Sequence, residues 1–120
     1  MAKIVLVEDT PANLALATKL LRAAGHEVLS ATSAADGVAL TQRERPDLVL
    51  MDLGLPDMDG TRAMEMIKDA AETKDVRVVA FTAYAMASDR ALALASGFDG
   101  YLTKPIDFAQ FASDVAGFLP

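Results

Sequence analysis

The sequence of 120 residues contains no cysteine. This absence excludes a disulfide framework, a thiolate metal site and a thiol nucleophile. The chain also lacks an apolar run long enough to cross a membrane, and the apolar stretch near Met1 is too short for a signal peptide. From these absences we expect a cytoplasmic protein without membrane contact.

Basic residues are few, with 11 Lys and Arg against 17 Asp and Glu, and they form no cluster. Nucleic-acid phosphates are contacted by grouped cationic side chains, so we expect no direct binding to DNA or RNA. Glycine and proline occur in ordinary numbers, and 52% of the residues are apolar. Residues 1–120 are therefore expected to form a single domain with a substantial core.

The central stretch of the chain is an apolar run, Leu48–Met51, that leads to Asp52 and lies between Pro46 and Pro56. Such a run is typical of a parallel strand that is buried on both faces. Asp52 should then lie at the carboxyl end of a strand, where open α/β sheets build their sites. A carboxylate at this position could serve as a nucleophile, as a metal ligand, or as both.

Strands and helices alternate along the whole chain. Strands are predicted at residues 3–7, 27–31, 48–51, 76–81 and 98–102, and helices at 11–24, 33–45, 59–71, 88–96 and from Asp107 onward. Strict alternation predicts an α/β fold, with five helices on both faces of a five-stranded parallel sheet. In the last helix a stripe is expected to pack into the core, formed by Phe108, Phe111, Val115 and Phe118.

Five polar residues directly follow predicted strands: Glu8, Asp9, Asp52, Thr82 and Lys104. Because parallel strands end at a common edge, these side chains should converge. Clustered carboxylates raise one another's pKa unless a cation lies among them, and oxygen ligands without His or Cys favour Mg²⁺. Together with a lysine and a hydroxyl donor, the group fits phosphoryl transfer to Asp52.

Each of these residues also has a purely structural interpretation. Asp52 could be a turn or cap residue, the acids at 8 and 9 could favour a helix N-terminus, and Thr82 could end a strand through local hydrogen bonds. Lys104 could lie in a solvated turn. The occurrence of all five at one edge of the sheet favours a site.

The chain resembles the receiver domains of response regulators in two-component signalling along essentially its whole length. Four segments carry the resemblance: Val7–Asp9, Leu50–Gly60, Phe81–Ala83 and Tyr101–Ile106. The resemblance implies a flavodoxin-like, CheY-like sheet with strand order 2-1-3-4-5.

For the site, the resemblance implies that Asp52 accepts a phosphoryl group from a histidine kinase or a histidine phosphotransfer protein. Asp9, Asp52 and the carbonyl of Gly54 would bind Mg²⁺ directly, and Glu8 would act through a water molecule. The protein would gain and lose its own phosphoryl group and would not be an enzyme with a separate substrate.

The resemblance further implies that Lys104 contacts the phosphoryl group, that the Lys104–Pro105 bond is cis, and that Thr82 and Tyr101 form a switch pair. Phosphorylation adds charge and acceptor atoms, which would attract Thr82 and let Tyr101 rotate inward. The surface of the fourth helix, fifth strand and fifth helix would then bind a downstream kinase or adaptor.

The fourth helix is expected to turn Ala91, Leu92 and Ala95 inward. A partner face would then lie on its other side, formed by Ala87, Arg90 and Leu94 with the neighbouring Tyr101. The residues two positions after Asp52 and Thr82, Gly54 and Tyr84, predict slow self-hydrolysis. We expect a monomer or weak dimer.

Residues 82–86 resemble the single-domain regulators of the DivK type, and no output domain is expected. A receiver excised from a hybrid histidine kinase is the alternative. A hydrolase with an aspartyl-phosphate intermediate would usually carry an acid where Gly54 stands. A flavodoxin-like FMN carrier would place phosphate at the loop after the first strand, where Glu8 and Asp9 would repel it.

Overall fold

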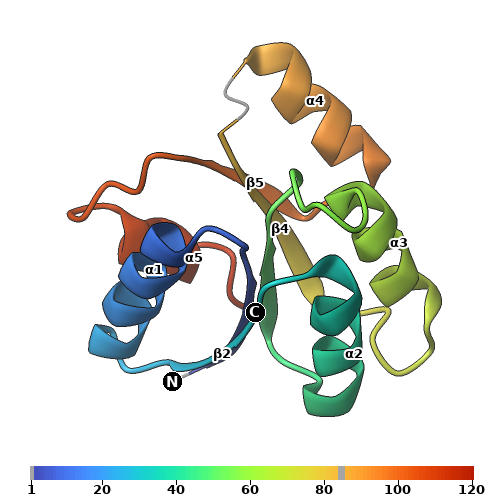
Figure 1. Cartoon of the computed structure of the whole chain (residues 1–120), viewed down its shortest axis with the longest axis horizontal. Coiled ribbons are helices and arrows are strands. Elements are labelled where there is room, and N and C mark those ends of the chain that lie inside the picture. Colours follow the sequence, from blue (N-terminus) through green and yellow to red (C-terminus); the bar gives the residue numbers. More distant parts are fainter. Residues whose placement is uncertain (1, 84–85) are drawn as a thin grey trace.

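The computed structural model describes residues 2–83 and 86–120. Its strands are β1 (Lys3–Val7), β2 (Glu27–Ala31), β3 (Leu48–Met51), β4 (Arg77–Thr82) and β5 (Gly100–Thr103). They form one parallel sheet in the order β2-β1-β3-β4-β5 (Figure 1). The predicted fold class and strand order are confirmed.

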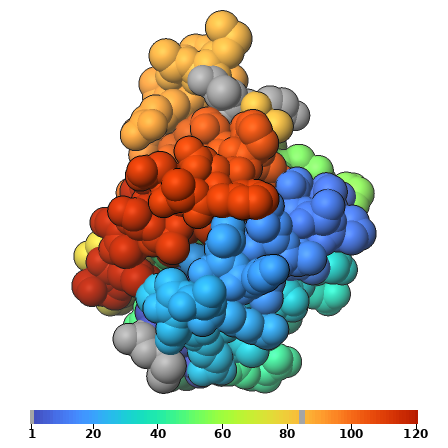
Figure 2. Space-filling model, turned by 90° about the vertical axis from the view of Figure 1, so that its left-hand side faces the viewer, coloured from blue at the N-terminus to red at the C-terminus, as the bar shows by residue number. Residues whose placement is uncertain are grey.

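Five helices connect and follow these strands: α1 (Pro11–Ala23), α2 (Ala34–Glu44), α3 (Gly60–Asp69), α4 (Ala87–Ser96) and α5 (Phe111–Ala116). One face of the sheet is covered by α2 and α3, and the other by α1 and α5 (Figure 1). The view of this second face in Figure 2 shows α1 beside the C-terminal part of the chain, with α4 projecting at the upper end. No helix in the described ranges combines the length and apolar character that a membrane span requires.

The start of α2 is fixed by its own sequence. Ser33 adopts an extended conformation at the N-cap, and its hydroxyl accepts a hydrogen bond from the N–H of Asp36 at 3.2 Å. Gly37 faces β1 so closely that an added Cβ would lie 2.6 Å from a methyl group of Val7. The helix can therefore pack directly on the strand that carries two of the predicted site acids.

The last helix begins later than predicted. The carbonyl of Asp107 accepts hydrogen bonds from Gln110 and Phe111 at 3.2 and 2.9 Å, and its carboxylate accepts one from Ala109 at 2.9 Å. These local bonds hold residues 107–110 in turns, so that α5 starts only at Phe111. Phe108 consequently lies outside the helical stripe and is 71% exposed, which corrects the expectation that it packs in the core.

The orientation predicted for α4 is also wrong. Leu92 is 69% exposed, and Ala91 and Ala95 are exposed as well, whereas Ala93 is the buried residue of this helix. Alanine and leucine alternate in this segment, so its apolar residues mark no single face.

Candidate functional site

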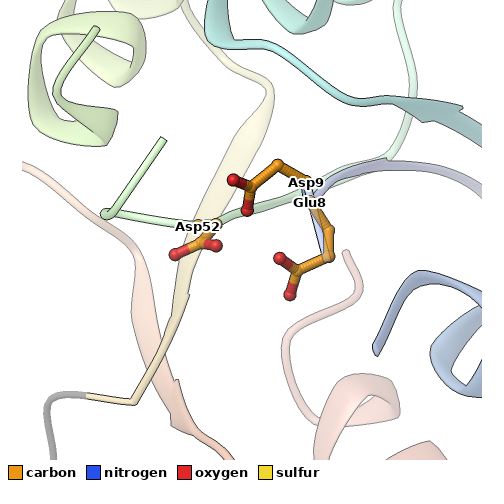
Figure 3. Close-up of side chains that lie close together, drawn as sticks. All are labelled: Glu8, Asp9 and Asp52. Carbon is orange, nitrogen blue, oxygen red and sulfur yellow. The ribbon is translucent and has the colours of Figure 1, made fainter. Parts of the chain in front are cut away.

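Three carboxylates meet at the carboxyl edge of the sheet. Glu8 and Asp9 directly follow β1, Asp52 directly follows β3, and Figure 3 shows their side chains gathered together. One oxygen from each lies within 4.8 Å of the others. Glu8 is fully buried and Asp52 is buried, while Asp9 is exposed. The cluster is thus anchored in the core and open to solvent at Asp9.

Backbone hydrogen bonds extend the strands into this cluster. The N–H of Asp52 donates to the carbonyl of Val7 at 3.0 Å, and the N–H of Glu8 donates to the carbonyl of Ala31 at 3.0 Å. Glu8 and Asp52 therefore continue the strand ladders, and the sheet sets their main-chain positions.

The two oxygens of Asp52 have different partners. Oδ1 accepts a hydrogen bond from the N–H of Gly54 at 3.0 Å, and Oδ2 accepts one from Nζ of Lys104 at 3.2 Å. The same ammonium forms an ion pair with Oε1 of Glu8. A single lysine with little exposed surface thus compensates two buried carboxylates and holds one oxygen of Asp52 in place.

Burial raises the pKa of Glu8 above its ordinary value. Lys104 opposes this rise, Asp52 adds to it as a second acid, and the N–H of Thr10, 3.3 Å from Oε2, opposes it. The cluster holds three carboxylates and one ammonium group, so it retains an excess of negative charge when ionised. A cation would lower this electrostatic cost.

The donor set fits a hard divalent cation. The three side chains of the cluster all offer carboxylate oxygens, and the exposed side at Asp9 leaves room for water ligands. Mg²⁺ binds through one or two carboxylates and retains several waters, which is the arrangement that this cluster offers. Nitrogen or sulfur ligands, which zinc favours, do not occur in the cluster.

Thr82 ends β4 beside Lys104. Its side chain is buried, and its carbonyl accepts a hydrogen bond from the N–H of Lys104 at 2.9 Å. Lys104 is followed by a cis bond to Pro105, as the resemblance implied. The structure therefore gathers Thr82, Lys104 and the three acids at the same edge of the sheet.

Tyr101 lies inside the molecule, with 3% of its surface exposed, and packs in the core on the α2 and α3 side of the sheet. Burial raises the pKa of its hydroxyl, the charge of Asp89 adds to this rise, and that of Arg90 opposes it. The inward position that we expected only after phosphorylation is thus already occupied in this structure.

Of the residues predicted for a partner face, Ala87, Arg90 and Leu94 are exposed, but the buried Tyr101 contributes little to the surface. A groove of about 470 Å³ lies next to Arg90, and its lining also includes Tyr101, Leu102 and Asp107. Tyr84, which entered the prediction of slow self-hydrolysis, lies outside the described residues.

Two residues near the site lie in the Leu50–Gly60 segment that carries the resemblance, but the sequence analysis assigned neither of them a role in the site. Asp57 accepts hydrogen bonds from the N–H groups of Ala34 and Ala35 at 2.9 and 3.0 Å, a contact across 23 and 22 residues that no local pattern predicts. Gly60 lies against the main chain of Asp52, where an added Cβ would be 2.5 Å from the carbonyl oxygen of that residue. The sequence signal at Gly60 was the preceding Asp59, which is a favourable N-cap residue and marks the start of a helix.

The comparisons with known proteins agree with this geometry. The family model of the response regulator receiver domain matches residues 4–116. Protein PilH of Pseudomonas aeruginosa is 38% identical over 107 residues, which are 89% of this chain and 88% of PilH. The polar-differentiation response regulator DivK of Brucella anthropi is 32% identical over 116 residues, 97% of this chain and 94% of DivK.

A solved structure similar to this chain is that of the receiver domain of the sensor histidine kinase PA1611 from Pseudomonas aeruginosa PAO1. It has 32% identity and a TM-score of 0.87, and the match covers 98% of this chain and 96% of that domain. That structure contains a magnesium ion coordinated in its active site cleft. Both the sequence comparisons and the structural comparison therefore relate this chain to receiver domains.

Proposed function

The chain belongs to the response regulator receiver domain family, and on this premise we propose that it is a phosphoacceptor switch whose acceptor is Asp52. The observation that carries the proposal is the set of three carboxylates within 4.8 Å, with Lys104 bonded to Asp52. The donor would be the phosphohistidine of a histidine kinase or of a histidine phosphotransfer protein.

In the proposed reaction a carboxylate oxygen of Asp52 attacks the phosphorus atom of the phosphohistidine. A P–O bond forms as the P–N bond breaks, and the imidazole nitrogen leaves with the bonding electron pair and takes up a proton. The N–H of Gly54 and the ammonium of Lys104 orient the two oxygens of Asp52 before the attack. The protein would only gain and lose its own phosphoryl group and would not act as an enzyme on a separate substrate.

Mg²⁺ would be held by Asp9, Asp52 and the carbonyl of Gly54, with Glu8 acting through a water molecule. When bound, the ion would neutralise charge on the transferring phosphoryl oxygens. Lys104, whose ammonium lies 3.2 Å from Oδ2 of Asp52, would contact the same oxygens as a point charge.

The output of the switch would pass through Thr82 and Tyr101. A phosphoryl group on Asp52 presents new acceptor atoms near the buried end of β4, where Thr82 lies. A shift of Thr82 would alter the packing of Tyr101, and with it the surface of α4, β5 and α5 that would bind a downstream kinase or adaptor. The groove along this surface supports the proposal.

The first test is covalent labelling. The protein is incubated with Mg²⁺ and a small phosphodonor, and intact-mass spectrometry follows the addition of one phosphoryl group. Asp52→Asn should abolish the label, because an amide is a far weaker nucleophile, while leaving the circular dichroism spectrum unchanged. Labelling of the variant at the wild-type level, or no labelling of the wild type, would refute the proposal.

The coupling step has its own test. Thr82→Ala should leave phosphorylation largely intact, because Thr82 does not supply the nucleophile, but it should weaken the binding of a partner that prefers the phosphorylated form. Equal binding of the two phosphorylated proteins would show that Thr82 does not transmit the signal. Asp52→Asn provides the unphosphorylated reference for this measurement.

A receiver of a hybrid histidine kinase would use the same site, and the similarity to the PA1611 receiver domain favours this as the second candidate. The two candidates differ in the donor. A hybrid-kinase receiver would be labelled by its attached kinase and would pass the phosphoryl group to a histidine phosphotransfer protein, whereas a separate regulator would be labelled in trans. We further propose a cytoplasmic location for either form.

A further inference from the structure

The loop between β3 and α3, residues 52–59, carries both Asp52 and Gly54 and is joined to a different part of the fold through Asp57. The carboxylate of Asp57 accepts one hydrogen bond on each oxygen, from Ala34 at 2.9 Å and from Ala35 at 3.0 Å. Both N–H groups belong to the first turn of α2 and lack intrahelical partners by their position. These bonds lower the pKa of Asp57, so the carboxylate is ionised at neutral pH.

Helix α2 in turn follows β2, and the end of β2 is hydrogen-bonded to the segment that carries the acids. The end of β2 just before α2 is bonded to Glu8, through the N–H of Glu8 and the carbonyl of Ala31 at 3.0 Å. On the other side, the N–H of Asp52 donates to the carbonyl of Val7. Asp57 therefore closes a ring that fixes the loop relative to the end of β1, where Glu8 and Asp9 lie.

The position of this loop matters because Gly54 would contribute only main-chain atoms to the site. A side-chain ligand can adjust its rotamer when the backbone shifts, but a carbonyl oxygen moves with the loop. Leu55 and Met58 also anchor the loop by apolar packing. Such packing is non-directional, whereas two directed hydrogen bonds fix the position of the main chain along the surface.

We propose that Asp57 is a positioning residue, which holds the loop against α2 so that the carbonyl of Gly54 and the carboxylate of Asp52 stay in register with Asp9 for cation binding. This inference rests on the proposed function, because it presumes that the cluster binds Mg²⁺. Removal of a residue that holds metal ligands in position typically lowers the affinity for the metal by about tenfold or more.

The competing explanation is that Asp57 only caps a helix. Ser33 is the matched control, because its hydroxyl caps the N–H of Asp36 within the same turn of α2, whereas Asp57 joins that turn to the loop. Ser33→Ala and Asp57→Ala should therefore weaken the start of α2 in similar ways. Only Asp57→Ala should release residues 53–58.

Two measurements on the full chain decide between these explanations. Titration calorimetry with Mg²⁺ alone should give a dissociation constant about tenfold higher for Asp57→Ala and unchanged within about twofold for Ser33→Ala. Amide NMR relaxation should show lower order parameters at residues 53–58 in Asp57→Ala only. Asp57→Asn, which keeps one acceptor oxygen, should give an intermediate result in both and serves if the alanine variant does not fold.

Equal effects of Asp57→Ala and Ser33→Ala on both measurements would overturn the positioning role. If the wild type bound no Mg²⁺, the proposed function would fail and the metal-positioning role with it. The relaxation data would then show separately whether the contact between the loop and α2 exists in solution, so the two failures can be distinguished.

Discussion

Helices α2 and α4 have similar lengths, 11 and 10 residues, but they are attached to the fold in opposite ways. Five residues of α2 are buried and its first turn is capped by Ser33 and Asp57. In α4 one residue, Ala93, is buried, and the N-cap residue Met86 makes no side-chain cap. Figure 1 shows α2 lying along the sheet and α4 projecting from its upper end.

This difference matches the two tasks that the proposed switch requires. The acids and the loop of residues 52–59 must be held in a fixed geometry, and α2 is the helix that contacts this loop. An output surface must respond to a small change in free energy, and an element with few buried contacts can move at low cost. The site is thus bounded by a firmly packed helix on one side and a weakly attached helix on the other.

A pair of leucine truncations would test most directly whether α2 and α4 differ in how firmly they are packed. Leu40→Ala in α2 removes a buried side chain and should lower the free energy of unfolding by about 3 kcal/mol. Leu92→Ala in α4 removes an exposed one and should change it by no more than about 0.5 kcal/mol. Urea unfolding followed by circular dichroism measures both. Similar losses in the two variants would mean that α4 is packed as firmly as α2.

A second pair of variants exchanges the capping of the two helices. Ser33→Ala should cost about 1 kcal/mol because it exposes an unpaired N–H at the start of α2. Met86→Ser should slow amide exchange in α4, since it supplies a hydroxyl at an uncapped and exposed N-terminus. Hydrogen exchange read by NMR reports each helix separately. Faster exchange in α4 of the serine variant would contradict this reasoning.

The smallest expected effect is on the stability of the protein at low pH. The pKa of Asp57 lies below its usual value of 3.8 because its ionised form accepts two backbone hydrogen bonds. Its stabilising contribution to α2 is therefore complete at neutral pH and is lost as the pH falls below 3.8 toward the lowered pKa. Asp57→Asn should flatten this part of the curve of unfolding free energy against pH. An identical acid limb in the variant and the wild type would argue against the contact.

The sequence analysis succeeded where a local pattern determines the structure. Runs such as Leu48–Met51 marked the strands, Ser33 marked the start of α2, and the sheet order followed from the resemblance. It failed at Phe108 because the local hydrogen bonds of Asp107 compete with a helical turn. It also failed on α4, whose alternating alanine and leucine residues leave its inward side undefined.

Within the candidate site, the gathering of the acids and Lys104 could be anticipated, because strand ends in a parallel sheet share an edge. The internal ion pair of Lys104 with Glu8 could not, since it depends on side-chain rotamers and on burial. The contact of Asp57 with α2 could not be predicted for another reason. Its partners are main-chain N–H groups, which occur at every helix start whatever the sequence.

The close approach of Gly60 to the main chain of Asp52 has a consequence for mutational libraries built on this protein. Any larger residue would press on a backbone atom that cannot rotate away, and would displace either the start of α3 or the main chain of Asp52. A survey that scores variants by loss of labelling would therefore rank Gly60 with Asp52, the proposed nucleophile, although glycine carries no reactive group. At Gly60 a steric clash would cause the same loss of labelling as the removal of a reactive group. A parallel assay for folded protein would separate these two causes.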